Sequence, residues 1–268
     1  MASNDSSKTV FLAFSVNFFI AGIKTVIAII TSSSAMFSEA VHSYVDSGNQ
    51  FILWFGMKQS KKPNKLIYPL GRGKEEYFWT LVVAVLIFTI GGLVSLEHGI
   101  EALSHPKELK NLFISIIVLS VSIILELYVL YKAVKELRSK AVDKNLPVFK
   151  LLKKSTDGPL IAIVVEDFAA TLGLGIALFG SILANVTGNP IFDAVSSIMI
   201  GLLLMLSGLF LGYEMKHLIT GETINIQTKD KIFKLIETNE LVKSVDSLKV
   251  VSIGCLLYTS PSPRDNRT

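Results

Sequence analysis

Six apolar segments constrain the fold of this chain more than any other feature. A helix needs roughly 20 apolar residues to cross the hydrocarbon of a bilayer. The segments that meet this length cover residues 9–30, 36–57, 77–100, 111–133, 159–184 and 190–213. Backbone groups in lipid must be hydrogen-bonded within the protein, which favours helices. The pattern therefore predicts an all-α polytopic membrane protein with six transmembrane helices.

Composition supports this class. Half of the 268 residues are hydrophobic and 18% are charged, whereas charged residues form about a quarter of an average soluble domain. The net charge of +4 does not indicate nucleic-acid binding here, because the basic residues cluster in short loops between apolar segments. The single cysteine, Cys255, excludes an internal disulfide and a thiolate metal cluster.

The basic loops predict the orientation of the helices. Residues 58–74 carry six basic residues and no acid, and residues 132–157 carry eight basic residues against three acids. The links at 31–35 and 185–189 are uncharged. The positive-inside rule places both basic loops and both termini in the cytoplasm, N-in/C-in. Residues 1–8 are then a cytosolic N-terminal tail, and residues 9–215 form the six-helix transmembrane domain.

The second apolar segment contains an ionisable pair at helical spacing. His42 and Asp46 are four residues apart, so their side chains lie on one face of a helix. Asp46 lies about 18 Å from the predicted cytoplasmic end of its helix, and Asp167 on the fifth segment about 13 Å from the corresponding end. Ionisable groups at mid-membrane depth indicate a functional site. The alternative is a polar pair that only joins helices.

Five other polar residues in or beside the apolar segments have less specific roles. We expect Asn17 to donate a hydrogen bond between helices, and Asp193 to act in capping or interfacial solvation rather than as a ligand. Glu126 could bond across helices, relay protons or contact a cation. We place His98 and His105 in the outer loop after the third helix, as surface histidines.

The site chemistry points to a divalent cation as cargo. Imidazole with carboxylates suits Zn²⁺ and is acceptable to Mn²⁺, Fe²⁺ or Co²⁺. His42, Asp46 and Asp167 supply such groups, and Glu166 lies about 100° further around the fifth helix. Because the same groups bind protons, a site with alternating access would exchange metal for protons. Walker, HExxH and GxSxG motifs do not occur, so we expect neither an enzyme nor a permanently bound cofactor.

Four motifs together resemble the cation diffusion facilitator family. They are SEAVHSYVDSGNQ, YPLGRGKEE, EDFAATLGLGIA and PIFDAVSSIMIGLLL, and the likeness extends nearly to Gly254. The resemblance implies a six-helix membrane domain followed by a cytosolic α+β domain, a homodimer, and antiport of zinc or a related metal against protons. It also implies a midplane site with a His/Asp-x-x-x-Asp pair on the second helix and another on the fifth.

The fifth helix departs from that family pattern. Only Asp167 matches, because Ile163 stands four residues earlier and cannot bind a metal. The Glu166–Asp167 pair resembles the branch that includes the ninth human zinc transporter. Glu166, Glu126 or water then completes the metal site. The expected function is proton-coupled efflux, with zinc as the leading cargo. Alternatives are a transporter of manganese, iron or cobalt, and a non-transporting membrane assembly or sensor protein.

The chain becomes polar after the sixth segment. Residues 216–254 predict a helix with Ile232, Leu235 and Ile236 on one face, then a strand at 248–253. One helix and one strand cannot close a core, so we expect the incomplete start of a cytosolic α+β domain. Residues 255–268 resemble translated sequencing-adapter read-through and are expected to be a non-native tail. A bacterial inner membrane is the simplest expected location, with an organelle membrane as the alternative.

Overall fold

The fold is known from a computed structural model. It describes residues 2–62, 67–68, 71–106, 109–141, 143–221, 226–238, 242, 245, 247–253 and 256–261. Side chains are described from Asn17 onward, except at 226–228, 249, 251–253 and 256–261.

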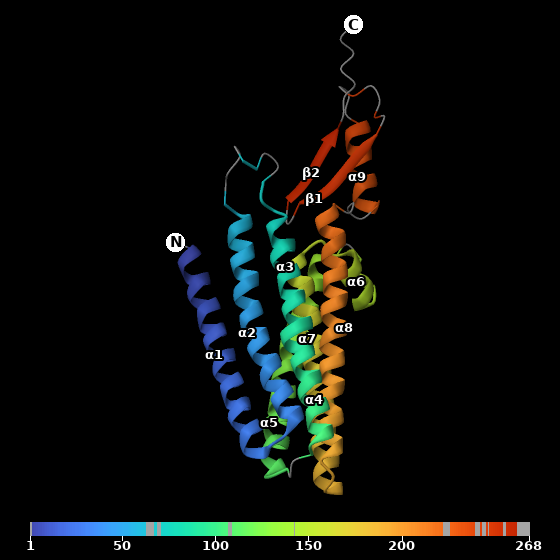
Figure 1. The fold of residues 1–268 in the computed structure, drawn as a ribbon. Helices are drawn as coiled ribbons and strands as arrows, with labels where there is room; N and C mark the ends of the chain where they lie inside the picture. The colour runs from blue at the N-terminus through green and yellow to red at the C-terminus, as the bar shows by residue number, and fades with distance from the viewer. Residues whose placement is uncertain are drawn as a thin grey trace.

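Six helical rods lie alongside one another in the described part of the chain (Figure 1). Five are the helices α1 (Ala2–Thr31), α2 (Ser34–Ser60), α5 (Leu112–Lys140), α7 (Gly158–Thr187) and α8 (Ile191–Thr220). The sixth is continuous from α3 (Glu75–Leu86) through the π-helix η1 (Ile87–Leu93) into α4 (Val94–Ser104). Each predicted apolar segment lies in one of these rods, so the helical prediction is confirmed.

Four of the rods are long and apolar enough to cross a membrane. They are the α3–η1–α4 rod, α5, α7 and α8. The apolar stretch of α1 whose side chains are described, Asn17–Thr31, is shorter, and α2 is interrupted by buried polar residues. The chain is therefore an integral, multi-pass membrane protein.

Glycines let α8 approach the third rod closely. A Cβ atom on Gly201 would lie 2.6 Å from the Leu96 nitrogen and 2.9 Å from the Gly92 oxygen. Both contacts are with backbone, which cannot turn aside as a flexible side chain can. The π-helix contains Gly92, so the irregular turn and the close crossing coincide. Small residues at such crossings favour association of membrane helices.

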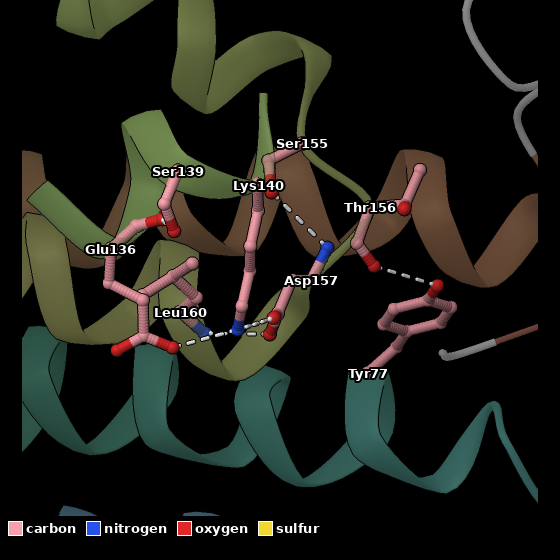
Figure 2. A network of polar contacts seen from close by, with 8 residues as sticks. All are labelled: Tyr77, Glu136, Ser139, Lys140, Ser155, Thr156, Asp157 and Leu160. Atoms are coloured by element: carbon pink, nitrogen blue, oxygen red, sulfur yellow. Dashed lines mark hydrogen bonds and ion pairs between the residues drawn. The ribbon is translucent and has the colours of Figure 1, made fainter. Parts of the chain in front are cut away.

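A polar network fixes the ends of α5 and α7 beside α3 (Figure 2). The Lys140 ammonium lies 2.8 Å from Glu136 Oε1 and 2.9 Å from Asp157 Oδ2. Asp157 also caps α7, because its Oδ1 accepts from the Leu160 amide at 3.1 Å. The Tyr77 hydroxyl donates to the Thr156 carbonyl at 3.0 Å.

The predicted loop at 132–157 is largely helical, so that part of the topology is corrected. Helix α5 continues to Lys140, and a short helix, α6 (Val148–Lys154), precedes α7. Its Leu151 and Leu152 are buried while its lysines are exposed. An amphipathic turn can therefore form in a strongly basic segment, because its apolar side packs on the bundle.

At the opposite end of the bundle, Asp193 binds the start of α2. Its Oδ1 accepts from the Ser33 hydroxyl at 2.6 Å, and its Oδ2 accepts from the amides of Ser34 and Ala35, the latter at 3.2 Å. The predicted capping role is confirmed, although the capped helix is α2 and not the helix that carries Asp193. We call this set of contacts the Asp193 clamp.

The last described residues form a small α+β unit. Helix α9 (Ile226–Glu237) precedes strands β1 (Leu248–Ile253) and β2 (Leu256–Pro261), which pair antiparallel. The predicted strand is confirmed by β1. Ile232 and Ile236 pack against β1, but Leu235 is 72% exposed, so its place on the apolar face was wrong.

The predicted non-native tail lies only partly within the described residues. Its residues 256–261 form β2, whereas Cys255 and residues 262–268 lie outside them. That this tail is foreign to the protein stays a prediction.

Candidate metal site

A cavity of about 240 Å³ lies among α1, α2, α5 and α7. Five carboxyl side chains line it, together with one lysine and one histidine. The carboxylates are Glu39, Asp46, Glu126, Glu166 and Asp167. If all were ionised, four negative charges would remain uncompensated by the lysine. Such a charge inside a helical bundle requires protons or metal cations to balance it.

Helix α2 contributes the predicted pair. His42 is 2% exposed, and its Nδ1 lies 3.2 Å from Asp46 Oδ1. The orientation is not that of a hydrogen bond, and neither ring nitrogen of His42 has a hydrogen-bond partner among the described residues. An unpartnered buried imidazole beside a carboxylate is suited to receive a cation.

Helix α7 contributes the other two predicted ligands. Glu166 Oε1 accepts a hydrogen bond of 2.6 Å from the side-chain amide of Asn49 on α2. Asp46 lines the same cavity as Glu166. Asp167 lines the same cavity, and its Oδ2 has no partner among the described residues.

The structure thus brings His42, Asp46, Glu166 and Asp167 to one cavity, as the matching depths of the two helices predicted. It does not draw them into a metal-binding cluster. Within the described ranges, no three His, Cys, Asp or Glu side chains converge closely enough to hold a metal ion. Their role as metal ligands stays a prediction.

Two ionisable residues of the cavity were missed by the sequence interpretation. The Lys24 ammonium on α1 donates to the Ser43 hydroxyl at 2.8 Å and lies 3.5 Å from Glu39 Oε2. Both charged side chains are almost fully buried. The signal was present, because Glu39 precedes His42 by three residues on one helical face and Lys24 lies within an apolar segment.

The other polar predictions have mixed outcomes. The Asn17 amide donates to Gln50 Oε1 at 3.1 Å, so its interhelical role is confirmed. Glu126 lines the cavity from α5, which leaves its three possible roles open. His98 was wrongly placed in a loop, because α4 continues to Ser104 and the His98 ring lies 4.1 Å from that of Phe37.

Comparison with known proteins decides the family. The model of the cation efflux transmembrane domain matches residues 10–218. The chain belongs to the cation efflux family. This confirms the resemblance that the four sequence motifs indicated.

Relatives of this cation efflux protein include two longer proteins. The mitochondrial proton-coupled zinc antiporter SLC30A9 of Homo sapiens is 32% identical over 247 residues, which are 92% of this chain and 44% of that protein. Metal tolerance protein C4 of Arabidopsis thaliana is 28% identical over 249 residues, covering 93% and 54% respectively. The chain spans about half the length of both. The likeness to the branch of the ninth human zinc transporter is confirmed.

A more distant relative of this cation efflux protein is magnetosome protein MamM of Magnetospirillum gryphiswaldense. It is 22% identical over 236 residues, which are 86% of this chain and 68% of that protein.

Proposed function

We infer that this chain is a proton-coupled divalent-cation antiporter whose principal cargo is zinc. The observation that carries the proposal is that five carboxyl side chains and His42 line one cavity within a cation efflux membrane domain. The names of the human and plant relatives, a zinc antiporter and a metal tolerance protein, support the same class of cargo.

The proposed ligands are His42, Asp46, Asp167 and Glu166. An imidazole with carboxylates forms a suitable zinc site. Each group must be deprotonated to bind metal, so protons on the carboxyl groups of the cavity compete with the ion. Entry of Zn²⁺ would release such protons, and departure of the ion would let them return. Glu126 or water remains a candidate for completing the coordination sphere.

The ligands line the cavity without converging, which fits a site that assembles around its cargo. Zinc bonds to nitrogen and oxygen are about 2.0–2.2 Å long, so the ion would draw α2 and α7 together through these side chains. A metal site that depends on the relation between two helices is sensitive to their movement. Alternating access to the two sides of the membrane would then couple binding, movement and release.

The proposed topology has six membrane spans, with α1 and α2 crossing beside the four more apolar rods. The basic segments 58–74 and 132–157 support an N-in/C-in orientation, with both termini in the cytoplasm. Residues 216–254 belong to a cytosolic α+β domain, and the protein acts as a homodimer. It has no enzymatic activity and no permanently bound cofactor. A bacterial inner membrane is the first proposed location and an organelle membrane the second.

A second candidate cargo is Mn²⁺, Fe²⁺ or Co²⁺. The cavity contains five carboxylates but one histidine, and oxygen-rich sites suit harder cations than zinc. Uptake of ⁶⁵Zn²⁺ in competition with each of these metals separates the candidates. Zinc remains the proposed cargo if unlabelled Zn²⁺ inhibits uptake of the label at a lower concentration than Mn²⁺, Fe²⁺ or Co²⁺ does.

The test uses purified protein in liposomes with an imposed pH gradient. We expect zinc uptake that collapses with the gradient and falls at least about tenfold in Asp46→Asn and Asp167→Asn. Glu97→Gln is the matched control, because Glu97 is an exposed carboxylate on α4 outside the cavity. Unchanged uptake in both aspartate variants would remove the site assignment. Calorimetry with no zinc binding by a folded protein would favour an assembly or sensor role.

A further inference from the structure

Glu39, beside Lys24, is a buried carboxyl group whose oxygens are incompletely satisfied by hydrogen bonds. Glu39 is 0% exposed, and neither of its carboxylate oxygens has a hydrogen-bond partner among the described residues. Its nearest charge is the Lys24 ammonium, 3.5 Å away, which donates its hydrogen bond to Ser43 instead. Buried carboxylates normally accept hydrogen bonds or bind cations. Glu39 therefore has free lone pairs in a cavity lined by other metal-ligand types.

Glycine on α7 makes room for this carboxylate. A Cβ atom on Gly173 would lie 2.9 Å from Glu39 Oε1, so any side chain there would press on the oxygen. The carboxylate thus lies where α2 faces α7, while Lys24 approaches it from α1. Helices α1, α2 and α7 therefore meet at the Glu39 carboxyl group. Its contact with α1 is the electrostatic one to Lys24, and its contact with α7 is the close steric approach to Gly173.

Glu39 also has a particular place along the cavity. It lies one helical turn from His42 and two from Asp46, on the side of α2 that leads to the α1–α2 turn. Between Glu39 and the start of α2 no further ionisable residue occurs. The next polar contacts in that direction are the hydroxyl pair of Ser38 and Ser197, 2.7 Å apart, and then the Asp193 clamp. A cation that leaves the cavity toward this end therefore meets Glu39 last among the carboxylates of α2.

We propose that Glu39 is a transient ligand for the divalent cargo between the midplane cavity and the α1–α2 end, and that Lys24, held on Ser43, is a tethered cation that competes with the cargo for Glu39. This rests on the transport function proposed above. A passing metal ion binds the free carboxylate oxygens while the ammonium stays on Ser43. When the ion departs, Lys24 again neutralises Glu39, so the carboxylate does not retain the cargo.

The test separates passage from equilibrium binding. Three variants are reconstituted beside the wild type: Glu39→Gln, Lys24→Met and the double variant Lys24→Met/Glu39→Gln. Zinc chloride binding is measured by calorimetry, and initial zinc uptake is measured under a pH gradient. Glu97→Gln again serves as the control for loss of a carboxylate.

We expect Glu39→Gln to bind zinc with the wild-type stoichiometry but to take it up about tenfold more slowly. The double variant leaves neither member of this pair without its partner, so it should fold as the wild type does and still transport slowly. Lys24→Met should lower both KM and kcat, because Glu39 then holds the cargo without a competitor. Each of these results supports the proposal.

Rapid uptake by the double variant would overturn the proposal, because the pair would then be a structural ion pair only. Unchanged KM and kcat in Lys24→Met would refute the tethered cation. Absence of zinc binding in the wild type would instead remove the transport function itself, and this proposal with it. Normal binding with normal uptake in Glu39→Gln would remove the transient ligand alone.

Discussion

Replacement of Asp193 by alanine provides a quantitative test of how α2 is held to α8. Its carboxylate is 1% exposed and accepts from the Ser33 hydroxyl and from two amides at the start of α2. These amides are among the four that a helix leaves unsatisfied at its start. The carboxylate also lies at the positive end of the α2 dipole. Asp193→Ala removes all three bonds together.

The magnitude follows from these contacts. A hydrogen bond to a charged group contributes about 1.5–3 kcal/mol, but the alanine variant no longer needs to bury a charge, which offsets part of the loss. Loss of a helix cap alone costs about 1 kcal/mol. We expect a net loss of about 3 kcal/mol, which lowers the unfolding midpoint by roughly 6–12 °C for a chain of this size.

The assay is thermal unfolding in detergent, followed by tryptophan emission. Trp54 on α2 and Trp79 on α3 report on the bundle. Ser196→Ala is the matched control, because its hydroxyl donates at 2.9 Å to a carbonyl of its own helix, and it should shift the midpoint by less than ~2 °C. A midpoint for Asp193→Ala equal to that of the control would refute the argument that the clamp stabilises the bundle.

Three further measurements address other parts of the molecule. Asp157→Ala should lower the free energy of unfolding by about 1–2 kcal/mol, because the α7 cap and the Lys140 contact are lost. Chemical denaturation measures this loss, with Ser139→Ala as the control. Equal denaturation curves for the two variants would contradict the prediction. Gly201→Ala should cost about 1–3 kcal/mol by overpacking the backbone of the third rod, whereas Gly175→Ala, which meets no atom within 4 Å, should be neutral or stabilising by thermal shift. Equal shifts would mean that the close crossing relaxes freely. Zinc affinity should weaken as pH falls, about tenfold per pH unit for each proton displaced, since protons compete for the carboxylates and imidazole. Calorimetry across a pH series measures this, and a flat profile would argue against proton coupling.

The local amino-acid sequence was sufficient to predict the helices and the pair of site residues on α2. Long apolar runs satisfy their backbone hydrogen bonds internally in lipid, so their helical state depends little on neighbours. The four-residue spacing of His42 and Asp46 likewise places both on one face of any helix. The family followed from motifs, and the model match over residues 10–218 bears it out.

Errors arose where packing decided the outcome. His98 lies in a helix because α4 continues to Ser104, where the His105 amide still bonds to the Glu101 carbonyl. The short helix α6 forms in a basic segment because Leu151 and Leu152 find an apolar surface. The end of α4 and the apolar surface under α6 depend on residues distant in sequence, so a short stretch of sequence does not reveal either.

The sequence by itself determined which segments are helical and that both the second and the fifth apolar segments carry carboxylates. Only the tertiary structure decided that Asp193 binds a helix start about 160 positions earlier, that Glu166 accepts a hydrogen bond from Asn49, and that Lys24 faces Glu39. The reason is physical: helix formation depends on local hydrogen bonds and hydropathy, whereas the partner of a buried charge depends on which helices pack side by side.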